Sequence, residues 1–223
     1  MYFHDRLEAG DMLANQLITY RYENTAILAL SPGGVLVGEQ IARRLHAPLS
    51  MMIVASITGP GDESLVFGGI DEEGRFSPAE SEASDFMSIG GIEAYQDDLR
   101  GYLEEEKVQK MSELARLWGE YGETRTDQLA GRTVILTSDG ITNGISVIAA
   151  VRYLKMIKAD RIVAAIPVGT FEAIEQASKV VNEFHYLYIP DTFLSVDHYY
   201  NENPTIDRAM VADHIDNIVA RWT

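Results

Sequence analysis

The sequence contains no cysteine. This absence excludes disulfides, thiolate metal sites, iron–sulfur clusters and cysteine nucleophiles, and it is typical of a reducing compartment. No uninterrupted apolar run exceeds five residues, which is too short to span a membrane. The first ten residues show no charged segment followed by an apolar one, so we expect no signal peptide and predict a cytoplasmic protein.

Basic residues are also scarce. Lys and Arg number 18 against 34 Asp and Glu, which gives a formal net charge of -16. Because so acidic a protein repels phosphate backbones, we expect no nucleic-acid partner. Residues 59–106 alone hold fourteen acidic and two basic residues. We therefore predict an acidic inserted segment at about 59–104, which is either a solvated surface or a lid or partner-facing module.

The composition is that of a globular protein. The 223 residues, 46% of them hydrophobic, predict one domain over residues 1–223. Short apolar runs alternate with amphipathic segments along the chain. Strands are expected at 26–30, 50–57, 132–137, 161–167 and 184–189, and helices at 5–20, 35–45, 105–118, 145–157, 171–180 and after Asn203. This alternation predicts an α/β fold: a parallel twisted sheet of about five strands with helices on both faces.

Ligands of such folds bind beyond the carboxyl ends of the strands. The predicted loops at that edge are 31–34, 56–63, 138–146 and 190–202. Outside these loops no catalytic set is convincing, because the five histidines lack H-E-x-x-H spacing and no G-x-S-x-G occurs. We predict neither a protein metal site nor a hydrolase nucleophile elbow.

The strongest candidate for a binding site follows the predicted strand 132–137. Asp139 stands at the strand end, and two glycines and a predicted helix come after it. Glycines let backbone N–H groups converge and a helix N-terminus adds partial positive charge, so the loop can hold a phosphate without a lysine. The predicted phosphate-binding residues are Gly140, Thr142, Asn143, Gly144, Ile145 and Ser146. A plain strand–turn–helix with an aspartate near the cap explains the same pattern.

A second candidate follows the predicted strand 26–30, where Ser31, Pro32, Gly33 and Gly34 stand in a row. Adjacent glycines allow positive φ or a close approach of the backbone to a ligand. A tight turn is the alternative. The segment lacks the G-x-G-x-x-G spacing, so we do not predict a dinucleotide site.

Several motifs in this order resemble the type I phosphoribosyltransferases over nearly the whole chain, from Phe3 to Tyr200. Residues 3–14 read FHDRLEAGDMLA, which is similar to the start of stand-alone bacterial domains of that family. The other matching stretches are LSPGG at 30–34, VILTSDGITNGIS at 134–146 and IPDTF at 189–193.

The resemblance implies a substrate and a role for each loop. It implies phosphoribosyl pyrophosphate bound with Mg²⁺, a nucleobase as acceptor, and Asp139 as the residue that holds the ribose hydroxyls. It assigns the 5′-phosphate to residues 140–146, the pyrophosphate to residues 31–34, and the base to Phe193 as a stacking platform. A core aromatic is the alternative for Phe193, and a homodimer stays open as the oligomeric state.

Three positions depart from the family pattern. Pro32 stands where close relatives carry arginine, Ser56 where they carry lysine, and Ser138 where the signature has an acidic residue. Pyrophosphate is a multiply charged leaving group, and its departure needs cations or metal. We therefore predict a protein that binds a ribose 5′-phosphate group, as phosphoribosyl pyrophosphate or a nucleoside monophosphate, with weak transfer activity. The alternatives are a catalytically inactive nucleotide sensor or scaffold, and a purely structural partner protein.

Overall fold

The main sheet has five strands in the order β2-β1-β6-β7-β8, and every pairing in it is parallel. This arrangement confirms the predicted α/β class. The computed structural model describes residues 2–59, 62–71, 74–78, 93–121 and 129–222. The strands are β1 (Thr25–Ala29), β2 (Leu49–Met51), β6 (Thr133–Thr137), β7 (Arg161–Val168) and β8 (Glu183–Tyr188). Because they are parallel, their carboxyl ends lie at one edge of the sheet.

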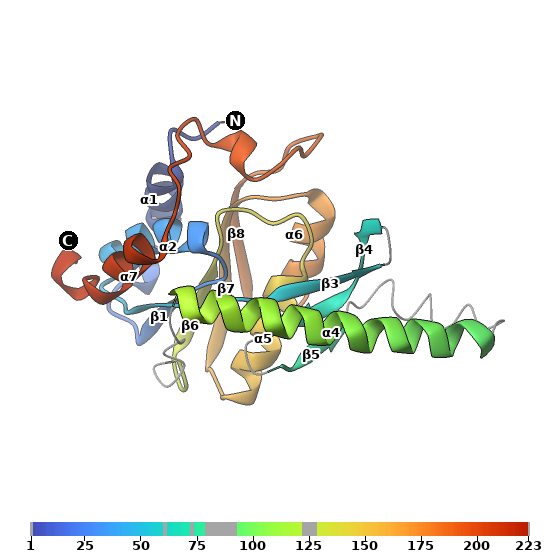
Figure 1. Cartoon of the computed structure of the whole chain (residues 1–223). Coiled ribbons are helices and arrows are strands. Elements are labelled where there is room, and N and C mark those ends of the chain that lie inside the picture. Colours follow the sequence, from blue (N-terminus) through green and yellow to red (C-terminus); the bar gives the residue numbers. More distant parts are fainter. Residues whose placement is uncertain (1, 60–61, 72–73, 79–92, 122–128, 223) are drawn as a thin grey trace.

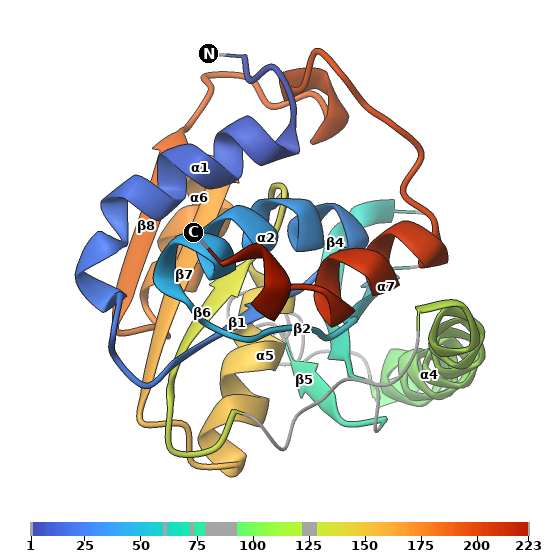
Figure 2. The ribbon, with the colours of Figure 1, turned by 90° about the vertical axis from the view of Figure 1, so that its left-hand side faces the viewer.

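Helices cover both faces of this sheet, as Figures 1 and 2 show. One face carries α1 (Arg6–Gln16) and α2 (Pro32–Leu45), and the other carries α5 (Ile145–Met156) and α6 (Phe171–Ser178). Three of these helices begin at a side-chain cap, in which a serine, threonine or aspartate accepts a hydrogen bond from a backbone N–H of the first turn. The predicted helix 5–20 ends earlier, at Gln16, and the short 3-10 helix η1 (Ile18–Tyr20) follows it.

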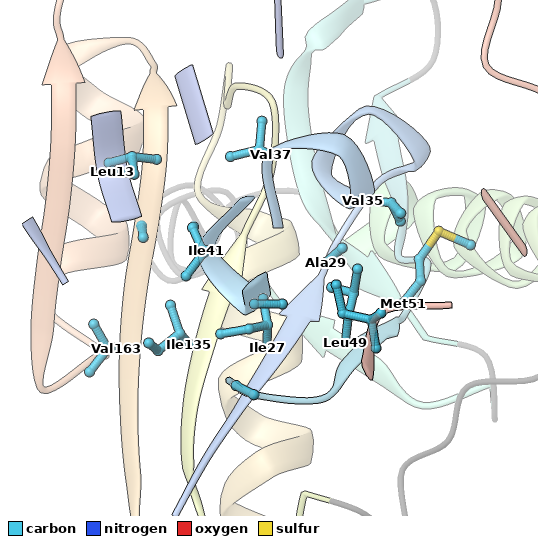
Figure 3. Close-up of a cluster of buried hydrophobic side chains, with 14 of the residues drawn as sticks. Leu13, Ile27, Ala29, Val35, Val37, Ile41, Leu49, Met51, Ile135 and Val163 are labelled. Atoms are coloured by element: carbon cyan, nitrogen blue, oxygen red, sulfur yellow. The ribbon is translucent and has the colours of Figure 1, made fainter. Parts of the chain in front are cut away.

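The two largest core clusters lie on opposite faces of the sheet because successive side chains of a strand point to opposite faces. Ile27 and Ile135 belong to the cluster under α1 and α2, which Figure 3 shows. Their neighbours Leu28 and Leu136 belong to the cluster under α5 and α6. All four are fully buried, so strands covered on both faces read as the continuous apolar runs seen in the sequence.

The predicted strand 50–57 is wrong, because it is two strands in two sheets. β2 ends at Met51, and β3 (Ala55–Gly59) starts a separate antiparallel sheet with β4 (Asp62–Ile70) and β5 (Phe76–Pro78). The apolar run continues across the break since residues on both sides of it are buried, so its periodicity does not reveal the change of sheet. β4 and β5 lie within the predicted acidic segment, whereas β3 precedes it except for Gly59. Residues 60–61, 72–73 and 79–92 of that segment are outside the described part.

A long helix, α4 (Glu93–Tyr121), completes the acidic segment. It begins before the predicted start at 105 and extends past the strands in Figure 1. The apolar residues at helical spacing along 105–118 would predict one buried face, but only part of it is buried: Leu114 is buried, whereas Val108 is 71% exposed and Met111 is 40% exposed. The helix contacts the core through Leu103, Leu114 and Leu117 instead. Among the described residues, no helix is both long and apolar enough to span a membrane.

The C-terminal helix starts later than predicted. α7 (Arg208–Asp216) is capped by Asp207, whose side chain accepts a hydrogen bond from the N–H of Met210 at 2.9 Å. The side chain of Asn203, the residue before the predicted helix, does not cap α7: its Oδ1 accepts a hydrogen bond from Arg6 of α1, and its Nδ2 donates to the carbonyls of Asp197 and Tyr200. Two further 3-10 helices lie in the described C-terminal part of the chain, η3 (Asp197–Tyr199) and η4 (Val219–Arg221).

A buried carboxylate on α2 holds the C-terminal segment in place. The side chain of Glu39 is 4% exposed and lies 2.6 Å from His214 Nδ1 and 2.8 Å from Arg221 Nη1. Burial alone would raise the pKa of Glu39, but the hydrogen bonds and charges of its two partners more than offset burial and lower that pKa.

Replacing this carboxylate by an amide should destabilise the fold. Glu39→Gln should lower the free energy of unfolding by about 2 kcal/mol at neutral pH, because the Arg221 guanidinium and the His214 ring then face an uncharged group. Urea unfolding followed by circular dichroism measures the change. Glu175→Gln breaks an exposed pair with Lys179 and should cost no more than about 0.5 kcal/mol.

The difference in free energy of unfolding between the wild type and Glu39→Gln should depend on pH. Because the folded pKa of Glu39 lies below the ordinary value of 4.5, its contribution is complete above that value and is lost as the pH falls through the folded pKa. The gap between wild type and Glu39→Gln should therefore narrow in acid. A gap that is constant with pH, or equal losses for the Glu39 and Glu175 variants, would contradict this account.

Candidate functional site

The predicted loop 31–34 is the first turn of α2. Ser31 is the N-cap, accepting a hydrogen bond from the N–H of Gly34 at 2.9 Å, and Pro32 occupies the first turn. A serine cap followed by proline favours a helix start, so the expected turn after β1 is wrong. The helix N-terminus points to the sheet edge where the strands end.

Close packing explains the two glycines. Neither Gly33 nor Gly34 has positive φ. A Cβ atom on Gly33 would lie 2.0 Å from Asp139 Oδ2, and one on Gly34 would lie 2.9 Å from Ser138 Cα. The first turn of α2 and the end of β6 therefore touch at positions that admit no side chain, which brings the two predicted loops together.

Asp139 is the carboxylate at this junction. Its side chain is 13% exposed. Oδ2 accepts a hydrogen bond from Arg6 Nε at 2.8 Å, and Oδ1 accepts one from Ser31 Oγ at 2.8 Å. Three segments far apart in the sequence meet at this one carboxylate.

Arg6 is a site residue that the sequence analysis did not identify as one. It lies in the first turn of α1, and its side chain is 7% exposed. Besides Asp139 it donates hydrogen bonds to Asp197 and Asn203, and its guanidinium stacks over the ring of Tyr200 at 4.7 Å. Burial alone would lower the pKa of Arg6, but the two aspartates more than offset burial and raise it.

The N-terminal motif thus has a structural meaning. Phe3 forms a parallel bridge with Tyr200, and the Tyr200 hydroxyl donates a hydrogen bond to the backbone carbonyl of Asp139. Burial, followed by the charge of Asp139, raises the pKa of this hydroxyl. Residues 3–14 carried the family resemblance, so this motif could have identified Arg6 as a site residue. The motif could not show that the partner of Arg6 is Asp139, which lies 133 positions away.

The 139–146 loop runs from β6 into α5. Asn143 Oδ1 accepts a hydrogen bond from the N–H of Ile145 at 3.2 Å, and Gly144 caps the helix without a side-chain bond. The N–H groups of Asn143, Gly144 and Ser146 have no acceptor within the part of the chain that the structure describes. The loop thus presents backbone donors at a helix N-terminus, as an anion site requires.

Neighbouring segments hold this loop in position. Thr170 Oγ1 donates to the carbonyl of Thr142 at 3.2 Å, and Ile141 forms a bridge with Gly169. Ser138, one of the three expected departures from the family pattern, is buried and donates from Oγ to the carbonyl of Gly140 at 3.0 Å. Ser138 therefore fixes the shape of the loop.

Phe193 lies in an aromatic cluster at the same edge of the sheet. Its ring centroid is 5.2 Å from that of Tyr199, and the side chain is half-buried. The loop that carries it also contacts the 139–146 loop, because a Cβ atom on Gly140 would lie 3.0 Å from both γ-carbons of Val196. A stacking role for Phe193 stays a prediction.

The Mg²⁺ that the family resemblance implies does not fit a site made by the described residues alone. Mg²⁺ takes oxygen ligands and is usually bound by carboxylates together with substrate phosphates. Both oxygens of Asp139 already accept hydrogen bonds. His4, Asp5 and Glu202 have ligand atoms within 4.8 Å of one another, but Asp5 already caps α1. The ion would therefore depend on the phosphates of the substrate.

Ser56, another expected departure from the family pattern, lies in β3 and pairs with Gly69 of β4. The small antiparallel sheet reaches the 139–146 loop, since a Cβ atom on Gly69 would lie 3.1 Å from Ile145 Cγ1. The acidic segment thus packs against the start of α5 through an apolar contact.

Comparison with known proteins identifies the family. The family model described as "Phosphoribosyl transferase domain" matches residues 3–185. The Mycobacterium tuberculosis protein named "Putative phosphoribosyl transferase Rv0571c" is 30% identical over 212 residues, which are 94% of this chain and 46% of that protein. The crystal structure of TT1426 from Thermus thermophilus has a TM-score of 0.73 and 26% identity, with 100% of both chains covered. This chain belongs to the phosphoribosyl transferase domain family, and it spans about half the length of the curated relative.

The contact between α2 and Asp139 can be tested with one methyl group. Gly33→Ala should lower the free energy of unfolding by about 1–3 kcal/mol, because the methyl group displaces Asp139 and the nearby Arg6 from a packed junction. Gly101→Ala in α4 is the control, since a Cβ atom there has nothing within 4 Å and alanine should add about 0.5–1 kcal/mol. Urea unfolding of both variants measures the difference; a stabilising Gly33→Ala would disprove the close approach.

Proposed function

We propose that this chain binds the ribose 5′-phosphate group of phosphoribosyl pyrophosphate or of a nucleotide at the 139–146 loop. The N-terminus of α5 is the observation that carries the proposal, because the N–H groups of Asn143, Gly144 and Ser146 have no acceptor among the described residues. Such donors, together with the helix dipole, favour a phosphate dianion. The membership of the chain in the phosphoribosyl transferase domain family supports the same ligand.

The rest of the ligand would extend toward α2 and the 190–202 loop. A carboxylate offers about four lone-pair positions, so Asp139 would accept a ribose hydroxyl in addition to its bonds with Arg6 and Ser31. The pyrophosphate would lie at the first turn of α2, whose N-terminus also carries partial positive charge. Phe193 would present its ring to a base.

A negative charge in the loop should weaken phosphate binding without destabilising the fold. Ser146→Asp places a carboxylate in the first turn of α5, where the helix dipole stabilises it and where it repels a phosphate. We expect ribose 5-phosphate to bind the wild type and to bind this variant at least about tenfold more weakly, as measured by isothermal titration calorimetry.

Ser112→Asp adds the same charge on an exposed position of α4 and is the control, with affinity expected to stay near that of the wild type. Thermal unfolding checks that both variants are folded. Absence of ribose 5-phosphate and nucleoside monophosphate binding by the wild type would refute the proposal.

Transfer activity should be weak. The guanidinium beside the first turn of α2 is that of Arg6, which already faces Asp139 and Asp197, and Pro32 and Ser56 add no charge. Each missing donor to a developing anion costs roughly a hundred- to a thousandfold in rate. We therefore expect weak or undetectable pyrophosphate release from phosphoribosyl pyrophosphate with adenine, guanine, hypoxanthine, uracil or orotate.

A coupled assay for pyrophosphate measures this release, with and without added Mg²⁺. Robust turnover with any of these bases would refute low activity and leave phosphate binding intact. Binding without turnover would instead favour a nucleotide-binding protein that does not catalyse transfer.

A further inference from the structure

Arg6 lies where the three proposed parts of the ligand site meet. Its Nε atom bonds to Asp139 of the 139–146 loop, and its Nη2 atom bonds to Asp197 of the 190–202 loop. The same guanidinium is next to the first turn of α2, since a Cβ atom on Gly33 would lie 2.8 Å from Arg6 Nε. One cation is shared by two carboxylates at this point, so the cluster carries an excess of one negative charge.

The two carboxylates differ in how easily each can separate from Arg6. The side chain of Asp139 is 13% exposed, whereas that of Asp197 is 71% exposed. Removing Asp139 from Arg6 would leave a charge that is shielded from water, which is costly. Asp197 would regain its hydration on leaving, and an ion pair with so exposed a partner contributes little.

Arg6 itself would stay in position without Asp197. Asp139 holds Nε, Asn203 Oδ1 accepts from Nη1 at 2.8 Å, and the ring of Tyr200 lies against the guanidinium plane. The bond to Asp197 leaves from Nη2. Loss of this one partner would therefore free a donor whose direction is already fixed by three other contacts.

We propose that Arg6 is the anion-binding residue of this site and that Asp197 is an internal carboxylate which an incoming pyrophosphate group displaces from it. The proposal rests on the function proposed above, because it adds a second anion position to the ribose phosphate site. A guanidinium binds phosphate oxygens through charge-assisted hydrogen bonds, and a pyrophosphate carries more charge than the single carboxylate it replaces. Asp197 lies on the loop that also holds Phe193, so its release would couple anion binding to the position of that loop.

Neutralising the competing carboxylate should strengthen binding of inorganic pyrophosphate. We expect Asp197→Asn to bind inorganic pyrophosphate about tenfold more tightly than the wild type in metal-free calorimetry, with no change for ribose 5-phosphate. Asp191→Asn is the control, because it removes one exposed charge from the same loop and Asp191 has no hydrogen bond to Arg6. Arg6→Lys should weaken pyrophosphate binding by about tenfold or more, since lysine lacks the planar group of donors.

Each outcome separates this inference from the proposed function. Unchanged pyrophosphate affinity in Asp197→Asn refutes the role of Asp197, even if the wild type binds ribose 5-phosphate. The role of Asp197 is also refuted if Asp191→Asn raises the affinity for pyrophosphate equally, or if Asp197→Asn raises the affinity for ribose 5-phosphate equally. Either result would mean that the loss of any negative charge strengthens anion binding. Selective tightening toward pyrophosphate supports it, and would do so even if ribose 5-phosphate failed to bind. Should Arg6→Lys fail to fold, the Asp197 and Asp191 variants still decide the question.

Discussion

The ion pair between Arg6 and Asp139 determines how the site is assembled. It joins α1 to the end of β6, and through Ser31, Asp197 and Asn203 it reaches α2 and the C-terminal loop. A buried charge is tolerated only when its hydrogen bonds are made, and here the partners come from segments far apart in the sequence. The position of each loop therefore depends on the others through one guanidinium and one carboxylate.

This arrangement places strict demands on the backbone around it. Gly33 cannot carry a side chain because Asp139 occupies the space that its Cβ atom would take. Ser31 both caps α2 and donates to Asp139, so the start of the helix and the orientation of the carboxylate are set by the same hydroxyl. The Ser138 hydroxyl donates a hydrogen bond to the carbonyl of Gly140 and so fixes the turn that leads to the backbone donors of residues 143–146. Ser138 therefore serves the shape of the loop although it carries no charge.

Local patterns in the sequence predicted the elements well and the contacts poorly. Strands β1, β6 and β7 were predictable because buried strands are continuous apolar runs. The turn after β6 was predictable from its glycines. Ser31 and Pro32 favour a helix start, but the two glycines after them are equally typical of a loop, so the local pattern does not determine where α2 begins. The change of sheet after Met51 leaves no mark in a run that is buried on both sides of the break. Arg6 could not be linked to Asp139, since an ion pair across 133 residues has no periodic signal.

The charge of the chain also limits how the site can work. A net charge of -16 repels anions at long range, but at physiological ionic strength this repulsion is screened beyond about 8 Å. Within that distance the nearest hydrogen-bond donors determine whether an anion binds. Here these donors are backbone N–H groups at the starts of α2 and α5, together with Arg6. Backbone donors have a fixed direction and do not titrate, so they can accept a phosphate in an acidic protein. The arginine is held at the junction by the largely enclosed Asp139, which leaves its exposed partner, Asp197, as the group whose charge most directly opposes a second anion.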